Sequence, residues 1–533
     1  MRSRARAVEP PSALARAALA VALLLGFYLV LLAAAAFLFV LPVGLLWHPV
    51  QTGHLDVRML FVVAMCWIPA SLLVMSVFAT RRPPFVPPKR RLQRDEAPGL
   101  FAMIDELATT AGTAPPGEVY LEPLPTLAVT EVGNAWRSRR ILFLGAPLLH
   151  MLTVDDLRVG IAHELGHFFG GDTRLTTIAV QTYALFDAVI TSTERDPFRI
   201  GTRHAAIEGG LWVAEAIGRG LVDGYGRIFL RLTRPMRRRQ ELAADALSAS
   251  LVGGQAAARA LEKVAIGMPF YRQYLTDDVA YAVSRGAMPT DLSAGFERMR
   301  ANVLATQGGR DFVDHVRTRE THAYDSHPAL ADRVRALEGI PDVDAPRDER
   351  PATTLFADPA ALDAWLVEAT RERLIAAAVA DVRQVPIIRE MPWDSIPVQV
   401  YAPAAREAAR RAAERLHPLF PDATTLGAIF VATWRGLESG KTVPIVLRLH
   451  PGLAHMEAQE ADRTALGLCH EVLLTLLQGA LLERGATMED TLGAPLALRL
   501  GEDRLVPAEL LALLATDGAA ARAAIDHWAR RLP

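Results

Sequence analysis

The sequence predicts an α+β protein in three parts. These are an N-terminal membrane anchor of two transmembrane helices with a linker (residues 1–91), a mainly helical domain with a small sheet (92–340), and an α+β accessory domain (352–533). Three observations predict this organisation: two long uncharged apolar runs, a middle region that mixes strand alternation with helical periodicity, and a break rich in Pro, Asp and Arg after Gly339. A chain of 533 residues has room for all three parts.

The two apolar runs are predicted to span a membrane. Residues 17–47 and 59–79 contain no charged residue, and a spanning helix needs roughly 20 apolar residues. Arginines precede the first run, and a basic cluster between Arg81 and Arg91 follows the second. The positive-inside rule therefore puts everything after Arg81 in the cytoplasm. A cleaved signal peptide is the alternative, but the length of the first run and the presence of a second argue against it.

Composition narrows the function classes. The chain has 57 Lys and Arg against 59 Asp and Glu, so no global charge attracts nucleic acid. Its two cysteines, Cys66 and Cys469, are too few for a thiolate metal cluster and do not make the pattern of a disulfide framework. Any metal is therefore expected on histidine and carboxylate side chains.

Between the anchor and residue 160 the sequence predicts a helix, three strands and a second helix. The Pro-rich residues 81–88 form a linker, and residues 92–112 carry an apolar stripe at helical spacing. The three strands are expected at residues 118–121, 127–130 and 139–145. Thr153 can cap a helix that follows it, and the acids at 155 and 156 favour its first turn.

The second helix carries the most informative pattern in the chain, Ile161-Ala-His-Glu-Leu-Gly-His-Phe168. His163 and His167 are four residues apart, so on a helix both imidazoles project from one face and can share a metal. Glu164 lies between them, where it could take a proton from a metal-activated water. A catalytic zinc needs three protein ligands and a water, so a third ligand must come from elsewhere.

Three positions compete for the third ligand. The metzincin arrangement fits Gly170, but its ligand position is Thr173, which excludes it. Asp172 could reach the metal if the chain turns back tightly after Gly170. Glu241 is followed four residues later by Asp245 on the same helical face, so one acid could bind metal while the other accepts a hydrogen bond from a ligating histidine. A solvated acidic face is the alternative for this pair, although its neighbours are apolar.

Together these motifs resemble the HtpX and CAAX-prenyl-endopeptidase family of zinc metallopeptidases. The resemblance covers roughly residues 92–337 and rests on the order of several motifs: Asn134-Ala-Trp136, Arg140-Ile-Leu-Phe-Leu-Gly145, Leu148-Leu149, Asp155-Asp-Leu157, Ala162-His-Glu-Leu-Gly-His167 with Asp172, and Glu241-x-x-Ala-Asp245. It implies a gluzincin with a zincin-type fold, in which two histidines and one glutamate hold zinc.

The resemblance also implies roles for individual residues near the metal. One Zn²⁺ per chain would be held by His163, His167 and Glu241. Glu164 would be the general base. Asp245, Asp172 and Arg333 would support the ligands.

Two further motifs are implied to contact the substrate. His327 begins a His-Pro…Arg motif that ends at Arg333, and it could donate to the oxyanion of the reacting carbonyl; an ordinary surface helix start is the alternative. Asn134, Ala135 and Trp136 resemble the family's edge strand, on which an extended peptide lies.

The stretch between the two ligand helices departs from the family's integral-membrane members, which have further spans there. Residues 176–192 are short and interrupted by Asp187, and residues 211–232 carry several charges, among them Glu215 and Arg219. A charge near a bilayer centre costs roughly 2.5–3.5 kcal/mol, which disfavours the second stretch most. Both stretches are interpreted as amphipathic helices of a cytosolic domain, which could lie against the membrane or cap the cleft. With two clear spans, the chain lacks the many-helix chamber of the CAAX-processing branch.

Residues 352–533 are predicted to form an accessory domain of helices and strands. Segments such as 358–366 and 404–416 have helical periodicity, whereas 387–388, 398–401, 428–433 and 443–449 resemble strands. The sequence here has no phosphate-binding glycine loop and no nucleophile motif, and its histidines are too widely spaced to suggest a second metal. Contact with a protein partner or substrate is the expected role.

The sequence therefore predicts a multi-pass, membrane-anchored zinc metalloendopeptidase with its catalytic domain on the cytoplasmic side. Its expected partners are a peptide or protein substrate, the lipid bilayer and a protein bound by the C-terminal domain, with no nucleic acid. The family resemblance implies quality control or processing of membrane proteins. Two alternatives stay open: a catalytically silent scaffold that acts through its C-terminal module, and a metallohydrolase acting on something other than peptide.

Overall fold

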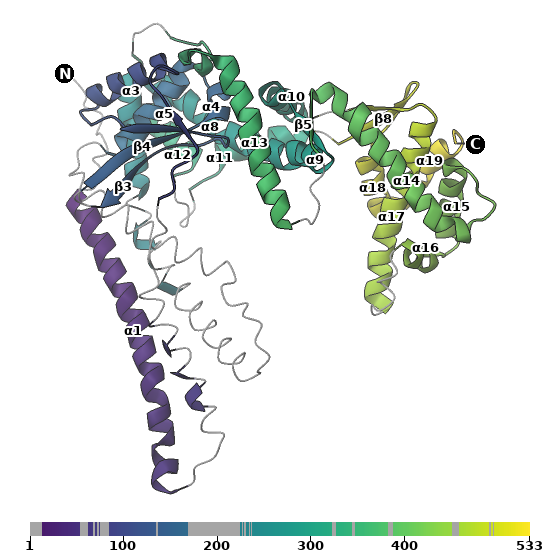
Figure 1. The fold of residues 1–533 in the computed structure, drawn as a ribbon, viewed down its shortest axis with the longest axis horizontal. Helices are drawn as coiled ribbons and strands as arrows, with labels where there is room; N and C mark the ends of the chain where they lie inside the picture. Colours follow the sequence, from purple (N-terminus) through teal and green to yellow (C-terminus); the bar gives the residue numbers. More distant parts are fainter. Residues whose placement is uncertain are drawn as a thin grey trace. The chain divides into compact units, whose positions relative to one another are not determined.

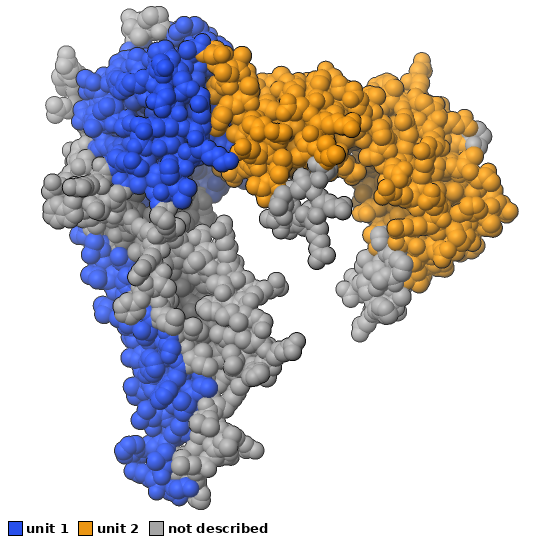
Figure 2. Space-filling view, viewed as in Figure 1, with its two compact units in different colours: residues 1–266, 314–357 blue, residues 267–313, 358–533 orange. Residues whose placement is uncertain are grey.

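The computed structural model describes most of the chain, with gaps (Figure 1). The described residues are 13–53, scattered residues between 62 and 74, 85–134, 137–168, scattered residues between 224 and 235, 237–321, 327–343, 347–381, 387–449, 458–489, 492–493 and 495–532. They form two compact units, coloured separately in Figure 2. Unit 1 comprises Met1–Ile266 and Asp314–Ala357, and unit 2 comprises Gly267–Val313 and Asp358–Pro533. The described part is mainly helical with small sheets.

The N-terminal helix α1 (Ala13–Gln51) contains one segment, Val21–Trp47, that is long and apolar enough to cross a membrane. Its helical conformation continues through Pro42 without a break. The second predicted span, residues 59–79, lies mostly outside the described residues. One membrane-length apolar helix is therefore what the described part of the chain supports, in place of the two predicted.

Tyr225 lies against this apolar helix. Its hydroxyl donates to the Leu23 carbonyl oxygen at 2.5 Å, and its ring centroid is 5.4 Å from that of Phe27. A Cβ at Gly26 would come within 2.7 Å of the Tyr225 hydroxyl oxygen, so glycine permits the approach. The sequence places residues 211–232 in cytosolic amphipathic helices, but at Tyr225 this stretch packs on the candidate span. Residues 176–192 lie outside the described residues.

Unit 1 contains a four-stranded sheet with the order β1-β2-β4-β3. Its strands are β1 (Arg90–Leu92), β2 (Glu118–Glu122), β3 (Leu127–Asn134) and β4 (Arg137–Gly145). The pairings are antiparallel except for β2 with β4, which is parallel. The three predicted strands are confirmed, and β3 lies at the edge of the sheet, with one side of its backbone unpaired by strands.

The helices of unit 1 are α3 (Pro98–Thr110), α4 (Ala146–Met151), α5 (Val154–Gly166), the first part of α8 (Gly254–Gln273), the end of α11 (Gln307–Thr318) and α12 (Leu330–Leu337), and residues 237–252 are also helical. Helix α5 begins as predicted, because the Thr153 hydroxyl accepts from the Asp156 N–H while the Asp156 carboxylate accepts from the Thr153 N–H. Val159 of α5 packs with Ala249, Ala257 and other small apolar residues. This packing joins α5 to the helix that carries Glu241.

The segment predicted as a linker between the middle and C-terminal domains is partly integrated into unit 1. Asp348 and Arg350 accept backbone hydrogen bonds from Asp155 and Val154 at 3.2 and 2.9 Å, so the segment lies against the first turn of α5. The next turn, η2 (Ala352–Leu355), packs on α3, where a Cβ at Gly99 would come within 3.3 Å of the Leu355 backbone. Its Pro and Asp content indicated a linker, but its backbone groups pair with α5.

Unit 2 begins inside the region that the sequence assigned to the middle domain. Its elements up to residue 401 are η1 (Tyr274–Val279), α9 (Ala280–Ser284), β5 (Ala287–Pro289), α10 (Leu292–Ala305), α13 (Pro359–Asp381), β6 (Arg389–Met391), η3 (Trp393–Ser395) and η4 (Pro397–Tyr401). Strands β5 and β6 pair in parallel. Trp393, Tyr274 and Phe296 pack together with exposures of 2% or less, which ties residues 267–313 to the C-terminal region.

The rest of unit 2 is helical apart from a small antiparallel sheet. The elements are α14 (Ala402–Leu416), η5 (His417–Leu419), α15 (Leu426–Glu438), α16 (Thr442–Leu449), α17 (Ala458–Glu483), β7 (Thr487–Glu489), β8 (Ala497–Leu500), β9 (Asp503–Leu505), α18 (Pro507–Thr516) and α19 (Gly518–Ala529). The predicted strands at 398–401, 428–433 and 443–449 are wrong, because these residues lie in η4, α15 and α16. Short apolar runs fit buried helices and buried strands equally well, and the Thr425 side chain caps α15.

Candidate metal centre

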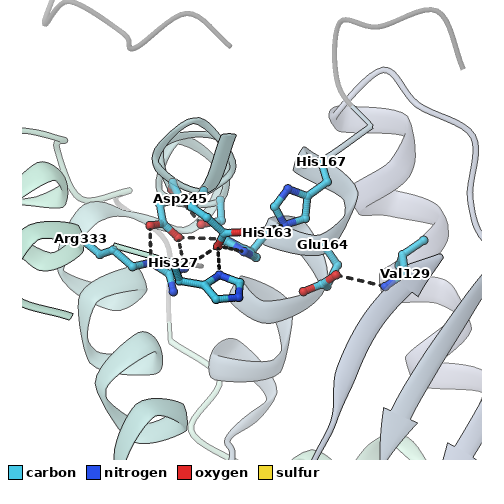
Figure 3. Close-up of polar contacts among 9 residues, drawn as sticks. Val129, His163, Glu164, His167, Asp245, His327 and Arg333 are labelled. Atoms are coloured by element: carbon cyan, nitrogen blue, oxygen red, sulfur yellow. Dashed lines mark hydrogen bonds and ion pairs between the residues drawn. The ribbon is translucent and has the colours of Figure 1, made fainter. Parts of the chain in front are cut away.

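Three elements of unit 1 bring the predicted site residues together (Figure 3). Helix α5 carries His163, Glu164 and, at its end, His167. Helix 237–252 carries Glu241 and Asp245, and the start of the α12 region carries His327 and Arg333. Residues separated by more than 160 positions in the sequence therefore meet at one place.

The two histidines face the two oxygens of Glu241. The distance from His163 Nε2 to Glu241 Oε2 is 3.5 Å, and that from His167 Nε2 to Glu241 Oε1 is 3.8 Å. Two donor atoms on one tetrahedral zinc ion lie about 3.4 Å apart when each is about 2.1 Å from the metal. The spacing of these three side chains therefore fits a shared zinc ion.

Glu164 is the second carboxylate near the histidines, since His163, Glu164 and His167 offer donor atoms within 4.8 Å of one another. Its carboxylate is already engaged elsewhere, because Glu164 Oε2 accepts the Val129 backbone N–H at 3.0 Å. Each oxygen of Glu241 faces one imidazole, whereas Glu164 turns towards Val129 of β3 (Figure 3). The geometry thus favours Glu241 as the ligand and leaves Glu164 beside it.

Asp245 orients His163. His163 Nδ1 lies 2.9 Å from Asp245 Oδ1, so a proton on Nδ1 leaves Nε2 free for a metal. Arg333 donates to both oxygens of Asp245, at 2.7 Å from Nε and 2.6 Å from Nη2. A fork of this kind fixes the carboxylate plane and, through it, the imidazole.

The same contacts set the protonation of the site. Burial by itself lowers the pKa of His163, but its hydrogen bonds to Asp245 and Glu241 outweigh burial and raise the pKa to about 9. Burial and the nearby charge of His163 lower the pKa of His167 to about 4. Burial raises the pKa of Glu164 above its usual range, against the opposing effects of His163 and the Val129 N–H. Burial also acts to raise the pKa of Glu241, yet hydrogen bonds from His163 and His327 hold it well below its usual range.

Of the remaining predicted site residues, some lie at the site and others lie outside the described residues. His327 Nδ1 lies 3.1 Å from Glu241 Oε2, and its side chain is 62% exposed, so it stands at the open side of the site. Asn134 ends β3, while Ala135 and Trp136, like Asp172, lie outside the described residues. The sequence reasoning missed Val129, whose N–H reaches Glu164. The sequence did predict a strand over residues 127–130. It could not predict this contact, because every residue except proline has a backbone N–H and the residue type does not show which one will donate.

The donor set has the chemistry of a catalytic zinc site. Two imidazole nitrogens and one carboxylate are a ligand set that suits Zn²⁺, and three protein ligands leave a position for water. Glu164 stands beside that position, and a carboxylate there can accept a proton from the water. Among the described residues, His163, Glu164 and His167 offer donor atoms within 4.8 Å of one another, and Glu241 adds a carboxylate that faces both imidazoles.

Comparison with known proteins agrees with this reading. Residues 98–341 match the model of Peptidase family M48. A protein named Protease HtpX from Aliivibrio fischeri (strain MJ11) is 27% identical over 155 residues, which is 27% of this chain and 53% of that protein. Protease HtpX homologs from Aquifex aeolicus (27% over 199 residues, 36% of this chain and 61% of theirs) and from a Sulfurihydrogenibium species (34% over 95 residues, 17% and 30%) are also similar.

The similarity is confined to part of each protein. The chain spans about half the length of the curated relatives that it matches. No solved structure matches it. The family predicted from the motifs is nevertheless confirmed, because residues 98–341 match the model of Peptidase family M48 and the similar proteins are named Protease HtpX.

Proposed function

We propose that this chain, which carries an M48 peptidase domain, is a membrane-anchored zinc-dependent metalloendopeptidase. The observation that carries the proposal is the convergence of His163, His167 and Glu241 at distances suited to one zinc ion. Asp245 and Arg333, behind His163, support it further. A scaffold without activity would have no need of a buried, correctly oriented ligand set.

In the proposed mechanism, the residues of this chain bind the metal and transfer one proton from water to the leaving group. Bound zinc would supply a Lewis acid and lower the pKa of a water molecule to about 7. Glu164 takes the proton as water attacks the scissile carbonyl carbon, and then gives it to the leaving amine nitrogen. Its raised pKa suits this exchange, and the Val129 N–H holds the carboxylate in place.

Negative charge that develops on the carbonyl oxygen needs a hydrogen-bond donor. We infer that His327 supplies it, since its ring lies at the open side of the site and contacts Glu241. Arg333 is committed to Asp245 and so acts by holding the ligand helix.

The substrate is proposed to be a peptide in extended conformation. The edge strand β3 runs beside Glu164, which accepts its Val129 N–H, and the edge of β3 that pairs with no strand of this sheet can add a strand regardless of sequence. Asn134, Ala135 and Trp136 would extend this contact. Recognition through the backbone suits an enzyme of low sequence specificity.

The proposed location is the cell membrane, with α1 as one of two spans and the catalytic domain on the cytoplasmic side. The apolar segment Val21–Trp47 supports membrane association, and the basic residues after Arg81 support the orientation. The relatives named Protease HtpX support a role in membrane-protein quality control or processing. Unit 2 is proposed to contact substrate or a protein partner.

The test is zinc content and casein cleavage of the detergent-purified full chain beside three variants. Glu164→Gln should keep zinc and lose about 10²–10⁴-fold in activity, since it removes the proton acceptor and preserves the shape. Glu241→Ala should lose zinc, and Asp172→Ala should keep it. Cleavage by Glu164→Gln at the parent rate would refute the mechanism, and zinc loss in Asp172→Ala alone would show that Asp172 is the ligand. Zinc without cleavage in the parent would favour the scaffold.

A further inference from the structure

Arg140 is a buried residue of β4 that lies against the end of α5, the helix that carries the two histidines. It stands on β4 directly opposite Glu131 of β3, and its Nε donates to Glu131 Oε1 at 3.0 Å. The side chains of this pair are 7% and 3% exposed. Its Nη1 also donates to Thr113 Oγ1 at 2.7 Å and to the Ala114 carbonyl oxygen at 2.9 Å. The guanidinium is thus fixed by three polar partners from two segments.

The flat face of this guanidinium covers Phe168. The Arg140 Cζ atom lies 4.5 Å from the centre of the Phe168 ring, and Phe168 is 8% exposed. An arginine can donate hydrogen bonds at its edge while its face stacks on an aromatic ring, which a lysine cannot do. The contact therefore depends on arginine and on an aromatic partner.

Phe168 directly follows His167, the proposed zinc ligand. Helix α5 ends at Gly166, and His167 stands at its C-cap. A helix end has carbonyl groups without intrahelical partners and is the part of a helix most prone to fray. His163, one turn earlier, is held by Asp245 at 2.9 Å, whereas the contacts of the His167 ring among the described residues are looser: Glu241 Oε1 at 3.8 Å and the edge-on ring of His163 at 4.9 Å. Because Phe168 is the next residue along the chain, a contact that fixes Phe168 also restricts the backbone of His167.

We propose that Arg140 is a positioning residue for the metal site, which fixes the His167 imidazole by clamping Phe168 at the exit of α5. The proposal rests on the proposed function, because it gives His167 the role of a zinc ligand. Glu131 keeps the guanidinium in place and links the clamp to the edge strand. A purely structural role would affect the stability of the domain and leave the ligand geometry unchanged.

The chain offers a matched control for this clamp. Arg94 lies over the ring of Phe101 at 5.0 Å, and Phe101 is also 8% exposed in unit 1, but it stands on α3, which carries none of the proposed ligands. Phe168→Leu and Phe101→Leu thus remove equally buried rings that each lie under a guanidinium, exposed at Arg94 and buried at Arg140. Arg140→Lys keeps the charge and loses the flat face, and Phe168→Tyr keeps the ring.

The experiment measures zinc dissociation constants by chelator competition and the visible absorption of the Co²⁺-substituted full-length protein. Phe168→Leu and Arg140→Lys should weaken zinc binding by about 10–100-fold and alter the Co²⁺ spectrum, as loss of support for a ligand does. Phe101→Leu and Phe168→Tyr should match the parent in both.

The proposal is overturned if Phe168→Leu and Arg140→Lys match Phe101→Leu in zinc affinity and Co²⁺ spectrum. Two independent variants on the clamp keep the test valid if one of them does not fold. Failure of the proposed function appears separately, as a parent protein that binds no zinc. In that case the clamp has no ligand to position.

Discussion

The interiors of the two units differ in what they bury. Among the described residues, the buried charged side chains, Glu131, Arg140, Asp156, Glu241 and Asp245, all lie in unit 1. The largest fully buried side chains of unit 2 are aromatic and include Trp393, Tyr271 and Tyr274. The polar side chains that unit 2 buries are the threonines Thr370 and Thr433. One interior is ionic around α5, and the other is an ordinary apolar core.

The difference shows where chemistry is concentrated. A charge removed from water is costly unless it is paired, and each buried acid around the metal site has a basic partner. Such a network contributes little net stability compared with apolar packing, so its presence indicates a requirement for oriented charges. Unit 2 shows no such requirement in its described residues, and its role is expected at its surface.

The largest effect that would test this contrast is on Arg333. Arg333→Met leaves Asp245, whose side chain is 5% exposed, with His163 as its remaining ionic partner. Breaking a buried pair by removing one partner costs about 3–5 kcal/mol. Hydrogen exchange followed by mass spectrometry should show lost protection in α5 and residues 237–252, with α10 unchanged.

Arg317→Met is the matched control for that variant. It breaks the exposed pair between Arg317 and Glu262, also in unit 1, where a surface ion pair contributes about 0–1 kcal/mol. Equal loss of protection in the two variants would mean that the charges around Asp245 are not an interdependent network.

A smaller effect is expected at Trp393 in unit 2. Its indole N–H donates to the Tyr274 hydroxyl oxygen at 2.8 Å, and a Cβ at Gly295 would lie 2.1 Å from that nitrogen, so the packing is tight. Trp393→Phe leaves the buried Tyr274 hydroxyl without this partner, which costs about 1–3 kcal/mol. Urea unfolding followed by hydrogen exchange in α10 and α13 would measure it.

The double variant Trp393→Phe with Tyr274→Phe sharpens this prediction. Replacing both partners by apolar groups removes the unpaired hydroxyl, so part of the lost stability should return. A double variant that is less stable than the single one would show that packing, and not the hydrogen bond, dominates this core.

The smallest effect concerns the reactivity of Cys469, with no change in stability. Burial raises the pKa of its thiol to about 12, and the thiol donates only to the Thr442 carbonyl oxygen, at 3.6 Å. Since the thiolate is the reactive form, a thiol reagent at pH 8 should react about 10³-fold more slowly than with the unfolded chain, whose thiol has its ordinary pKa. The rate should rise tenfold with each pH unit above 8.

A Cys66→Ala background leaves Cys469 as the single thiol for this measurement. The comparison is the same protein in urea, followed by absorbance of the released reagent. Equal rates in the two states at pH 8 would show that this interior is open to water and that the contrast between the units is smaller than described.

Predictions from the sequence were right where a feature depends on residues close by in the chain, and wrong where it depends on distant segments. The start of α5, the strands at 118–121 and 139–145 and the placement of both histidines on one helix depend on neighbours within a few residues, and all are confirmed. The strands expected in 428–433 and 443–449 are wrong, because a short apolar run does not reveal whether a helix or a sheet will bury it. The linker before residue 352 was misjudged because its backbone partners in α5 are almost 200 residues away.

The sequence by itself determined the chemistry: an HExxH helix, an acidic pair four residues apart and too few cysteines for a thiolate cluster predict a histidine–carboxylate metal site, and the order of the motifs resembles the HtpX family of metallopeptidases. Only the tertiary structure decided which carboxylate faces both imidazoles, that Val129 holds Glu164 and that Arg140 covers Phe168. The physical reason is the range of each interaction. Residue type and helical spacing act over one or two turns, whereas the direction of a carboxylate or a backbone N–H depends on segments that meet only when the chain has folded.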